Sequence, residues 1–363
     1  MRARLKLAFA ISSAALLLAA CGGSAKPSAS TSSAATSSSS AGGNGSVASS
    51  SGKCPYTFAV ITHGDNGSFW SVVYKGAKNA AADFGCKLSE VYGSQQQGQA
   101  EPDDNAENAQ IQDAINAHVS GIAVSDHDPA LMNPTIAKAV ADGIPVVLLN
   151  AGCDPADLAA THAITCVGQP ETQAGQAAGA ELKKIGATNV LCVIHQSGQN
   201  LLDRCDGLAQ GLGLGSTCST RTASAHGPGC TEIILSTPNA ASNPQQAIGQ
   251  VTAYLQAHPG INAVLSLNTA ISDALVAAHP AGVKLATFDL DPTVLTDLKS
   301  GSLTFAIDQQ QYLQGYLPIA ALYLYKKHEG NSLAPGAVLP TGPLVVTKAN
   351  VGSVVAAVSN GDN

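Results

Sequence analysis

Carboxylates and side-chain amides follow the short apolar runs of this sequence, at the points where the runs end. Carboxylates accept hydrogen bonds from hydroxyl groups, while Asn and Gln side chains both donate and accept them. Hydrogen bonds to a charged group are about twice as strong as those between neutral groups. The residues are Asp65, Asn66, Asp126, Asp128, Asn150, Asn268, Asp289 and Gln309. Their recurrence predicts reversible binding of a small hydroxyl-rich molecule, such as a sugar or a polyol.

Two adjacent aromatic residues, Phe69 and Trp70, follow the loop after the first apolar run. Aromatic residues make up 4% of the chain and Trp70 is its single tryptophan, so their position is informative. The apolar C–H face of a sugar packs well on an aromatic ring. The alternative is that both rings pack beneath the first helix, a common location for large aromatic side chains. We expect at least one of them to contact the ligand.

The polar residues after the apolar runs have a second explanation, which is helix capping. Loops that lead from a strand into a helix generally end in a capping residue, and Asp65, Ser68 and Asp291 fit that role. Caps do not require the recurring amides, however. The complete pattern therefore favours a binding site.

The elements that must position these residues are strands and helices in alternation. From Cys54 onward, short apolar runs alternate with longer amphipathic segments, which is typical of βα units around a parallel sheet. The predicted strands are 56–62, 87–92, 121–125, 145–150, 163–167, 190–194, 232–235, 263–267, 284–288, 304–307 and 344–347. The predicted helices are 69–84, 105–118, 131–142, 172–185, 201–212, 244–257, 271–278, 292–300 and 312–328. This count predicts an α/β fold with two doubly wound parallel-sheet lobes. Ligands bind such sheets at the carboxyl ends of the strands, where the polar residues fall.

The N-terminus has the anatomy of an export signal. Arg2, Arg4 and Lys6 precede an apolar segment, residues 7–18, that is too short to span a bilayer. Residues 18–22 (LAACG) resemble the lipobox of bacterial lipoproteins. The resemblance implies a signal peptide over residues 1–20, cleavage before Cys21 and a lipid anchor on its thiol. The alternative is an ordinary secretory signal with an incidental cysteine.

Residues 21–53 join this signal to the folded part, and almost all of them are Ser, Ala, Gly or Thr. Such a composition cannot bury enough apolar surface to offset its ordering entropy. We expect a disordered tether. About 310 residues remain, which is enough for two domains.

Eight of the nine cysteines remain when Cys21 is set aside, an even number in an exported chain. Disulfides are therefore expected. The spacing favours sequential pairs: Cys54–Cys86, Cys153–Cys166, Cys192–Cys205 and Cys218–Cys230. A metal site is the rival explanation, but the chain contains no CxxC motif. We expect neither a metal nor another cofactor.

The composition argues against nucleic-acid binding. The net charge is −7 and charged residues make up 12% of the chain, whereas nucleic-acid binding needs a dense Lys and Arg surface.

Several segments in order resemble ribose-binding-protein-like periplasmic binding proteins, the type I family. The matching segments are 58–70 (FAVITHGDNGSFW), 143–147 (GIPVV), 204–208 (RCDGL), 287–289 (TFD) and 305–316 (FAIDQQQYLQGY). The resemblance covers nearly all of the chain from Tyr56 to Asn350. It implies two α/β lobes that are joined by three crossings and close on a sugar.

The resemblance also implies ligand contacts. The aromatic loop contributes Asp65, Asn66, Phe69 and Trp70, and the carboxylate after the third strand falls on Asp128, or on Asp126 after a small register shift. The helix arginine falls on Arg204, which would donate forked hydrogen bonds. The remaining contacts fall on Asn268, Asp289 and Gln309. The chain departs from the family at Gly67-Ser68, where many relatives carry Asn-Pro, and at Asn150, where Asp is frequent. These departures leave the identity of the sugar open.

The lobe boundaries follow from the same resemblance. The first lobe is expected to hold residues 54–151 and 310–340, and the second residues 152–309 and 341–363. The implied function is capture of a sugar or polyol by a monomer on the outer face of the cytoplasmic membrane, for delivery to the membrane permease of an ABC importer.

Two other functions remain open from the sequence. A ligand-sensing receptor component would use the same closure. A secreted α/β enzyme is the other alternative, but no GxGxxG, GKS/T or GxSxG motif supports it. Asp126, His127 and Asp128 together with His63 suggest a metal cluster, yet they lack a recognised ligand spacing.

Overall fold

The computed structural model describes residues 54–64, 67–90, 93, 102–215, 217–218, 229–330 and 336–363. The predicted signal peptide, Cys21 and the tether at residues 21–53 lie outside the described residues, as do Asp65 and Asn66. Residues 52–363 form one compact unit. This unit contains two α/β lobes, each built on a six-stranded sheet.

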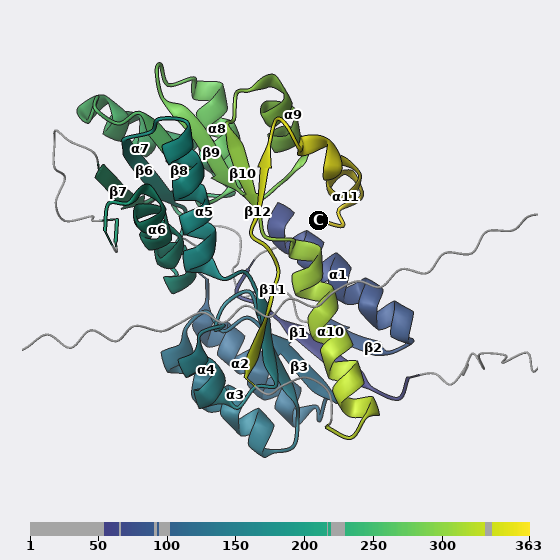
Figure 1. Ribbon diagram of the computed structural model, residues 1–363. Helices are drawn as coiled ribbons and strands as arrows, with labels where there is room; N and C mark the ends of the chain where they lie inside the picture. The colour runs from purple at the N-terminus through teal and green to yellow at the C-terminus, as the bar shows by residue number, and fades with distance from the viewer. Residues whose placement is uncertain are drawn as a thin grey trace, which may run out of the picture. The chain divides into compact units, whose positions relative to one another are not determined.

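The first lobe is built on an all-parallel sheet with the order β11-β5-β4-β3-β1-β2. Its strands are β1 (Thr57–Ile61), β2 (Lys87–Glu90), β3 (Gly121–Val124), β4 (Val146–Leu149), β5 (Thr165–Gly168) and β11 (Ala337–Pro340). The helices α2 (Asp104–Asn116), α3 (Pro129–Ala141) and α4 (Pro155–Thr161) pack on one face. The helices α1 (Ser68–Phe84) and α10 (Gln311–Lys327) pack on the other (Figure 1).

The second lobe repeats this plan with the order β12-β10-β9-β8-β6-β7. Its strands are β6 (Asn189–Ile194), β7 (Gly229–Ile234), β8 (Ala263–Ser266), β9 (Lys284–Phe288), β10 (Phe305–Asp308) and β12 (Leu344–Thr347). Only β12 pairs antiparallel, with β10. The helices α5 (Glu171–Lys184) and α6 (Gln199–Leu212) cover one face. The other face is covered by α7 (Pro244–Ala257), α8 (Thr269–Ala278), α9 (Pro292–Ser300), the 3₁₀ turn η1 (Val351–Ser353) and α11 (Val355–Asn360).

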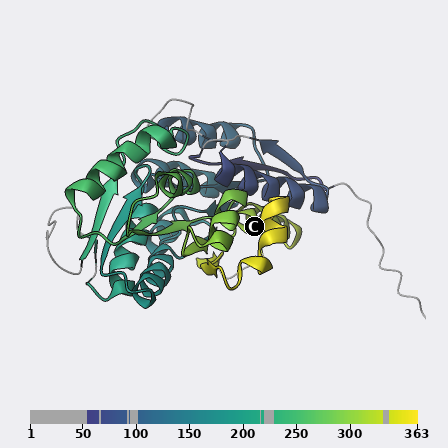
Figure 2. The same cartoon turned by 90° about the horizontal axis from the view of Figure 1, so that it is seen from above.

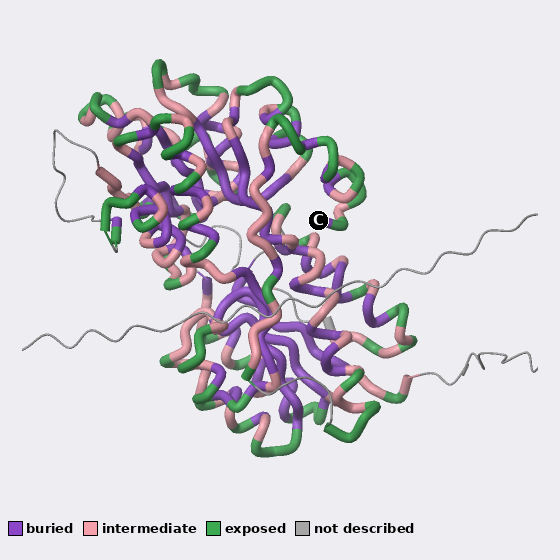
Figure 3. Tube along the Cα trace, in the orientation of Figure 1, coloured by how far each residue is buried: buried purple, intermediate pink, exposed green. Residues whose placement is uncertain are grey.

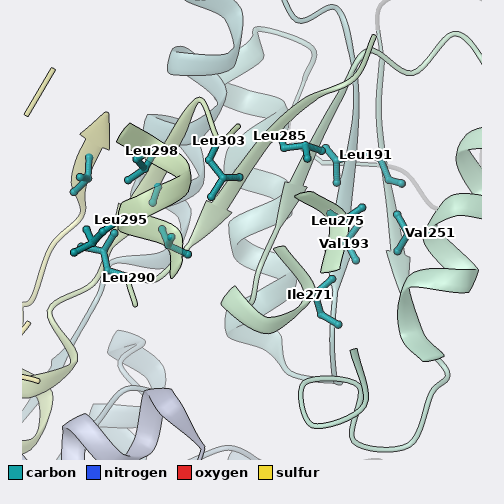
Figure 4. Packing of buried hydrophobic residues seen from close by; sticks show 14 of the residues in the cluster. Leu191, Val193, Val251, Ile271, Leu275, Leu285, Leu290, Leu295, Leu298 and Leu303 are labelled. Carbon is teal, nitrogen blue, oxygen red and sulfur yellow. The ribbon is translucent and has the colours of Figure 1, made fainter. Parts of the chain in front are cut away.

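The cores follow from these layers. Figure 3 shows buried segments concentrated in the strands of both sheets. Strands covered on both faces read as continuous apolar runs, as VVLL in β4 does. Figure 4 shows part of the apolar cluster on one face of the second sheet, which includes Leu191 and Val193 of β6 and leucines such as Leu275, Leu285 and Leu298. Rigid sheets of this kind hold the loops at their carboxyl ends in place.

The pair α5 and α6 packs unusually closely because glycines face each other. A Cβ on Gly175 would lie 2.1 Å from the Arg204 carbonyl oxygen, and one on Gly207 would lie 2.1 Å from the Thr172 carbonyl oxygen. Any larger residue would force the helices apart. This contact brings the first turn of α5 beside Arg204.

The chain changes sheets three times, and one predicted boundary is wrong. We expected the first change after Ala151, but β5 pairs with β4, so residues 152–168 belong to the first lobe. A fully buried apolar strand carries no local sign of which sheet it joins. The second change lies between β10 and α10, and the third between β11 and β12 (Figure 1), close to the expected positions.

The cysteines are joined in the sequential order expected from their spacing. The disulfides are Cys54–Cys86, Cys153–Cys166, Cys192–Cys205 and Cys218–Cys230. The third ties β6 to α6 at its buried face. Each of these disulfides joins two segments of the same lobe that lie near each other in the sequence.

The C-terminus lies against α1 and the start of α10 (Figure 2). The backbone N–H of Tyr312 donates to the Asn363 carbonyl oxygen at 2.6 Å, and Lys75 pairs with Asp362 at 2.7 Å. The last helix, α11, packs on the second sheet, so the tail contacts both lobes. Within the described residues, no helix combines the length and hydropathy needed to cross a membrane.

Candidate ligand-binding site

The two sheets present matching positions at their carboxyl ends. Counted along the strand orders, β4 of the first sheet corresponds to β9 of the second, and β3 corresponds to β8. Asn150 and Asp289 directly follow β4 and β9, and Asp126 and Asn268 come two residues after β3 and β8. The fold therefore places polar side chains at equivalent sites of both lobes.

A first cavity of about 110 Å³ lies at these strand ends and is lined by both lobes. Seven of the ten predicted ligand contacts line it: Phe69, Trp70, Asn150, Arg204, Asn268, Asp289 and Gln309. The structure thus gathers residues that lie as far apart in the sequence as Phe69 and Gln309.

Arg204 lies in α6 and is only 3% exposed. Its Nε and one terminal nitrogen donate to the two carboxylate oxygens of Glu171 at 2.7 and 2.8 Å. Its guanidinium also lies 4.7 Å from the centre of the Phe288 ring. Burial alone disfavours the charge, but the Glu171 carboxylate and its hydrogen bonds raise the pKa of Arg204. Arg204 is therefore a fixed cation at the wall of the first cavity.

A chain of hydrogen bonds continues from Arg204 across the crossings. Gln309 accepts from Arg204 at 3.4 Å and donates to Asp289 at 2.6 Å. Gln314 of α10 donates to the side-chain oxygens of Gln309 and Thr341, each at 3.1 Å. Asn150 donates to Gln314 at 3.0 Å. This network joins the ends of β4 and β9 through the second and third crossings.

Asp289 is buried in this network. Burial raises the pKa of Asp289 to about 7, although Arg204 and the Gln309 hydrogen bond oppose the rise. One oxygen accepts from Gln309. The carboxyl group lies in the wall of the first cavity, and carboxylate oxygens accept hydrogen bonds from hydroxyl groups.

Two neutral imidazoles also line the first cavity. Burial, with a further contribution from Arg204, lowers the pKa of His195 to about 3. Burial lowers the pKa of His63 well below its ordinary value, and His127 and His195 lower it further. The His195 Nδ1 atom has no hydrogen-bond partner among the described residues. Neutral imidazoles both donate and accept, so they suit a hydroxylated ligand.

The aromatic pair packs in the core of the first lobe and also borders the first cavity. Trp70 is 7% exposed, packs in the core with α1 and still borders the first cavity. Its indole stands edge-on to His63 at 4.9 Å and to Phe69 at 5.0 Å. A Cβ at Gly64 would lie 1.7 Å from the indole nitrogen, so glycine is needed there.

One predicted contact is placed elsewhere. Asp128 is the N-cap of α3, where it accepts from the backbone N–H groups of Ala130 and Leu131 at 3.1 and 3.3 Å, and it does not line the first cavity. Asp126 is the buried carboxylate of this loop, at 1% exposure. Capping explains the difference, because Asp128 directly precedes the helix. Asn268 caps α8 and lines the first cavity at the same time.

Sequence reasoning missed several residues of the site. Glu171, Asn200 and Gln314 lie on helices, where a polar residue ordinarily indicates a solvated face. His195 and Gln196 follow the predicted strand 190–194 and line the first cavity directly after β6, although they were not among the predicted ligand contacts. Among the described residues, no group of three or more His, Cys, Asp or Glu side chains could hold a metal ion.

Comparisons with known proteins agree on one family. A family model described as "Periplasmic binding protein domain" matches residues 58–330. The xylose/arabinose-binding protein of Sulfolobus acidocaldarius is 25% identical over 256 residues, which is 66% of this chain and 59% of that protein. The chain therefore spans less than two thirds of that relative's length.

Solved structures show the same fold. A carbohydrate transporter from Acidothermus cellulolyticus 11B, in complex with myo-inositol, is 33% identical with a TM-score of 0.73, covering 85% of this chain and 99% of that one. A solute-binding protein from Burkholderia graminis C4D1M, in complex with D-arabinose, is 23% identical with a TM-score of 0.67, covering 83% and 98%. These relatives and the fold are those of solute-binding proteins and not of enzymes. The chain belongs to the periplasmic binding protein family, an extracytoplasmic family, and has the ribose-binding-protein-like type I fold.

Proposed function

We propose that this chain is a lipid-anchored solute-binding protein that captures a sugar or polyol between its lobes and delivers it to an ABC importer. The observation that carries the proposal is the pair Asn150 and Asp289, which lie at equivalent strand ends of the two lobes and line one cavity. A ligand bound to both residues favours the closed form because its contacts are complete only there.

The chemistry of the first cavity supports a neutral, hydroxylated ligand. Asp289 accepts, while Asn150, Gln309 and the neutral His195 offer both donors and acceptors. Trp70 borders the same cavity and supplies an aromatic ring on which the ligand's apolar face can pack. The relative from Acidothermus cellulolyticus holds myo-inositol at 33% identity, which makes a cyclic polyol the first ligand to test.

The test is a thermal-shift screen of residues 52–363 against myo-inositol, pentoses, hexoses, linear polyols and amino acids. A ligand at a hundred times its Kd stabilises by about 2.7 kcal/mol, which shifts Tm by at least ~2 °C. We expect a clear shift with one class of sugar or polyol. No shift with any of them, from folded protein, would reject the proposal.

A further inference from the structure

A second cavity, of about 390 Å³, lies beside the first. The two cavities share Asn150 and Asn200. Side chains from the loop after β3, from α4 and from α6 line it, together with residues 169–173 at the first crossing. Of the first-cavity residues proposed above to contact a sugar, Asn150 alone also lines this cavity.

The walls of the second cavity are rich in acidic side chains. Four carboxylates line it besides Glu171, which pairs with Arg204: Asp126, Asp154, Asp157 and Asp203. No Lys or Arg is among its lining residues, and within the described chain none of the four forms an ion pair. His127, which also lines it, pairs with Asp104 at 2.9 Å. The cavity is therefore electrostatically suited to a cation.

Two buried side chains in its wall offer acceptors that nothing satisfies. Asp126 and Gln169 are each 1% exposed. Both carboxylate oxygens of Asp126 and the Oε1 of Gln169 lack a hydrogen-bond partner among the described residues. The Gln169 amide nitrogen donates to Glu171 at 2.8 Å, which fixes the amide with its oxygen unused. Buried acceptors without donors are costly, so each of them calls for a partner such as water, an ion or a ligand.

The unsatisfied oxygens of Asp126 and Gln169 require a hydrogen-bond donor, and the arrangement of the carboxylates does not suit a metal ion. The carboxylates are spread over the walls of the second cavity and do not converge on one point that could hold a metal. A group that carries only donors and a positive charge matches acceptors of this kind. A primary ammonium group has three donors and no acceptor.

We propose that the second cavity binds a primary ammonium group, with Asp126 and Gln169 as its acceptors. The inference rests on the proposed function, because the second cavity adjoins the first at Asn150 and Asn200. The amine belongs either to an amino sugar whose hydroxyl groups fill the first cavity or to a separate small amine that binds beside a neutral sugar.

Proton linkage gives the inference a second readout. Burial raises the pKa of Asp126 to about 7, and Asp157, Asp128 and Asp104 raise it further while His127 lowers it. Glu107 of α2, whose own pKa is raised by burial and then by Asp104 and Asp126, faces it as well. At pH 6.5 the ligand-free carboxyl is mostly protonated. An ammonium group that binds there releases most of one proton.

The experiment is isothermal titration calorimetry of residues 52–363 at pH 6.5, in two buffers that differ in ionisation enthalpy. The probes are glucosamine against glucose, and putrescine alone and with saturating myo-inositol. Asp126→Asn removes the charge while keeping the shape, and Asp113→Asn removes a carboxylate from an exposed position of α2 as the matched control.

We expect an amine probe to bind the parent with proton release, and Asp126→Asn to weaken it at least about tenfold and abolish the release. Asp113→Asn should bind as the parent does. Glucosamine binding assigns the amine to the cleft ligand, while putrescine binding assigns it to a separate molecule. Neutral sugars binding without any amine preference would overturn this inference and leave the proposed function standing. Binding of neither amines nor neutral sugars would reject both this inference and the proposed function. If Asp126→Asn does not fold, the parent protein decides: proton release on amine binding supports the inference, and amine binding without it overturns the inference.

Discussion

Asn150 and Asp289 occupy the same position in the two lobes. Each directly follows the third strand of its sheet, counted from β11 in the first lobe and from β12 in the second. Both adopt left-handed backbone conformations, with φ of 62° and 71°. Both are buried and both hydrogen-bond to a glutamine, Asn150 to Gln314 and Asp289 to Gln309. The two lobes therefore place a buried polar side chain with the same backbone conformation at equivalent strand ends.

The ion pair of Arg204 and Glu171 gives a prediction about positioning. Glu171→Gln keeps the shape but removes the charge that holds the guanidinium, leaving a buried cation partly unpaired. We expect ligand affinity to fall at least about tenfold, together with a lower Tm. Glu181→Gln, also in α5 and paired in the described structure with the exposed Lys184, is the control and should change neither. Unchanged affinity in Glu171→Gln would show that the pair does not position Arg204.

His127 joins the lobes directly. Its Nδ1 lies 2.9 Å from Asp104 of the first lobe and its Nε2 lies 3.1 Å from the Ser197 carbonyl oxygen of the second. His127→Ala should weaken ligand binding about tenfold by removing a contact that holds the two lobes together. The exposed His328→Ala is the control. Equal affinities in the two variants would rule out this contribution to closure.

The buried acids predict how stability depends on pH. Burial raises the pKa values of Asp126, Asp273 and Asp289 to about 7. Between about pH 4 and 7 the folded protein thus binds more protons than the unfolded chain, and stability falls as pH rises. His63 and His195, with lowered pKa values, act in the opposite direction up to about pH 6.5 but are fewer.

The measurement for this prediction is Tm of the ligand-free protein from pH 5 to 8. We expect Tm to fall over this range, and the advantage of Asp126→Asn over the parent to grow with pH, because the variant has no buried charge to form. A constant difference between the two proteins would contradict the raised pKa of Asp126.

Sequence reasoning found the strand ends but not the pairings made across the fold. A position just after a predicted strand was enough to select Asn150, Asn268 and Asp289, because residues at the carboxyl ends of parallel strands converge at one edge of the sheet. The partner of Arg204 was not predictable, since Glu171 is brought to it by the close glycine contact of α5 and α6. Asp128 was misplaced because a cap and a ligand contact look alike in a sequence.

The lipid anchor is a prediction from the sequence around Cys21. Cells fed an alkyne-bearing fatty acid should label the parent protein, and Cys21→Ser should lose the label and appear in the soluble fraction. Ser24→Ala serves as the control for a change near the cleavage site. Equal labelling of the Cys21→Ser variant would contradict an anchor on that thiol.

The central claim is that Asp289 binds the captured sugar or polyol. Isothermal titration of residues 52–363 with the ligand found in the screen tests it, with Asp289→Asn as the variant, because Asn tolerates the left-handed backbone. We predict one site per chain in the parent and at least about a hundredfold weaker binding in a variant that remains folded. Binding of the same strength in both proteins would contradict the account and place the site elsewhere.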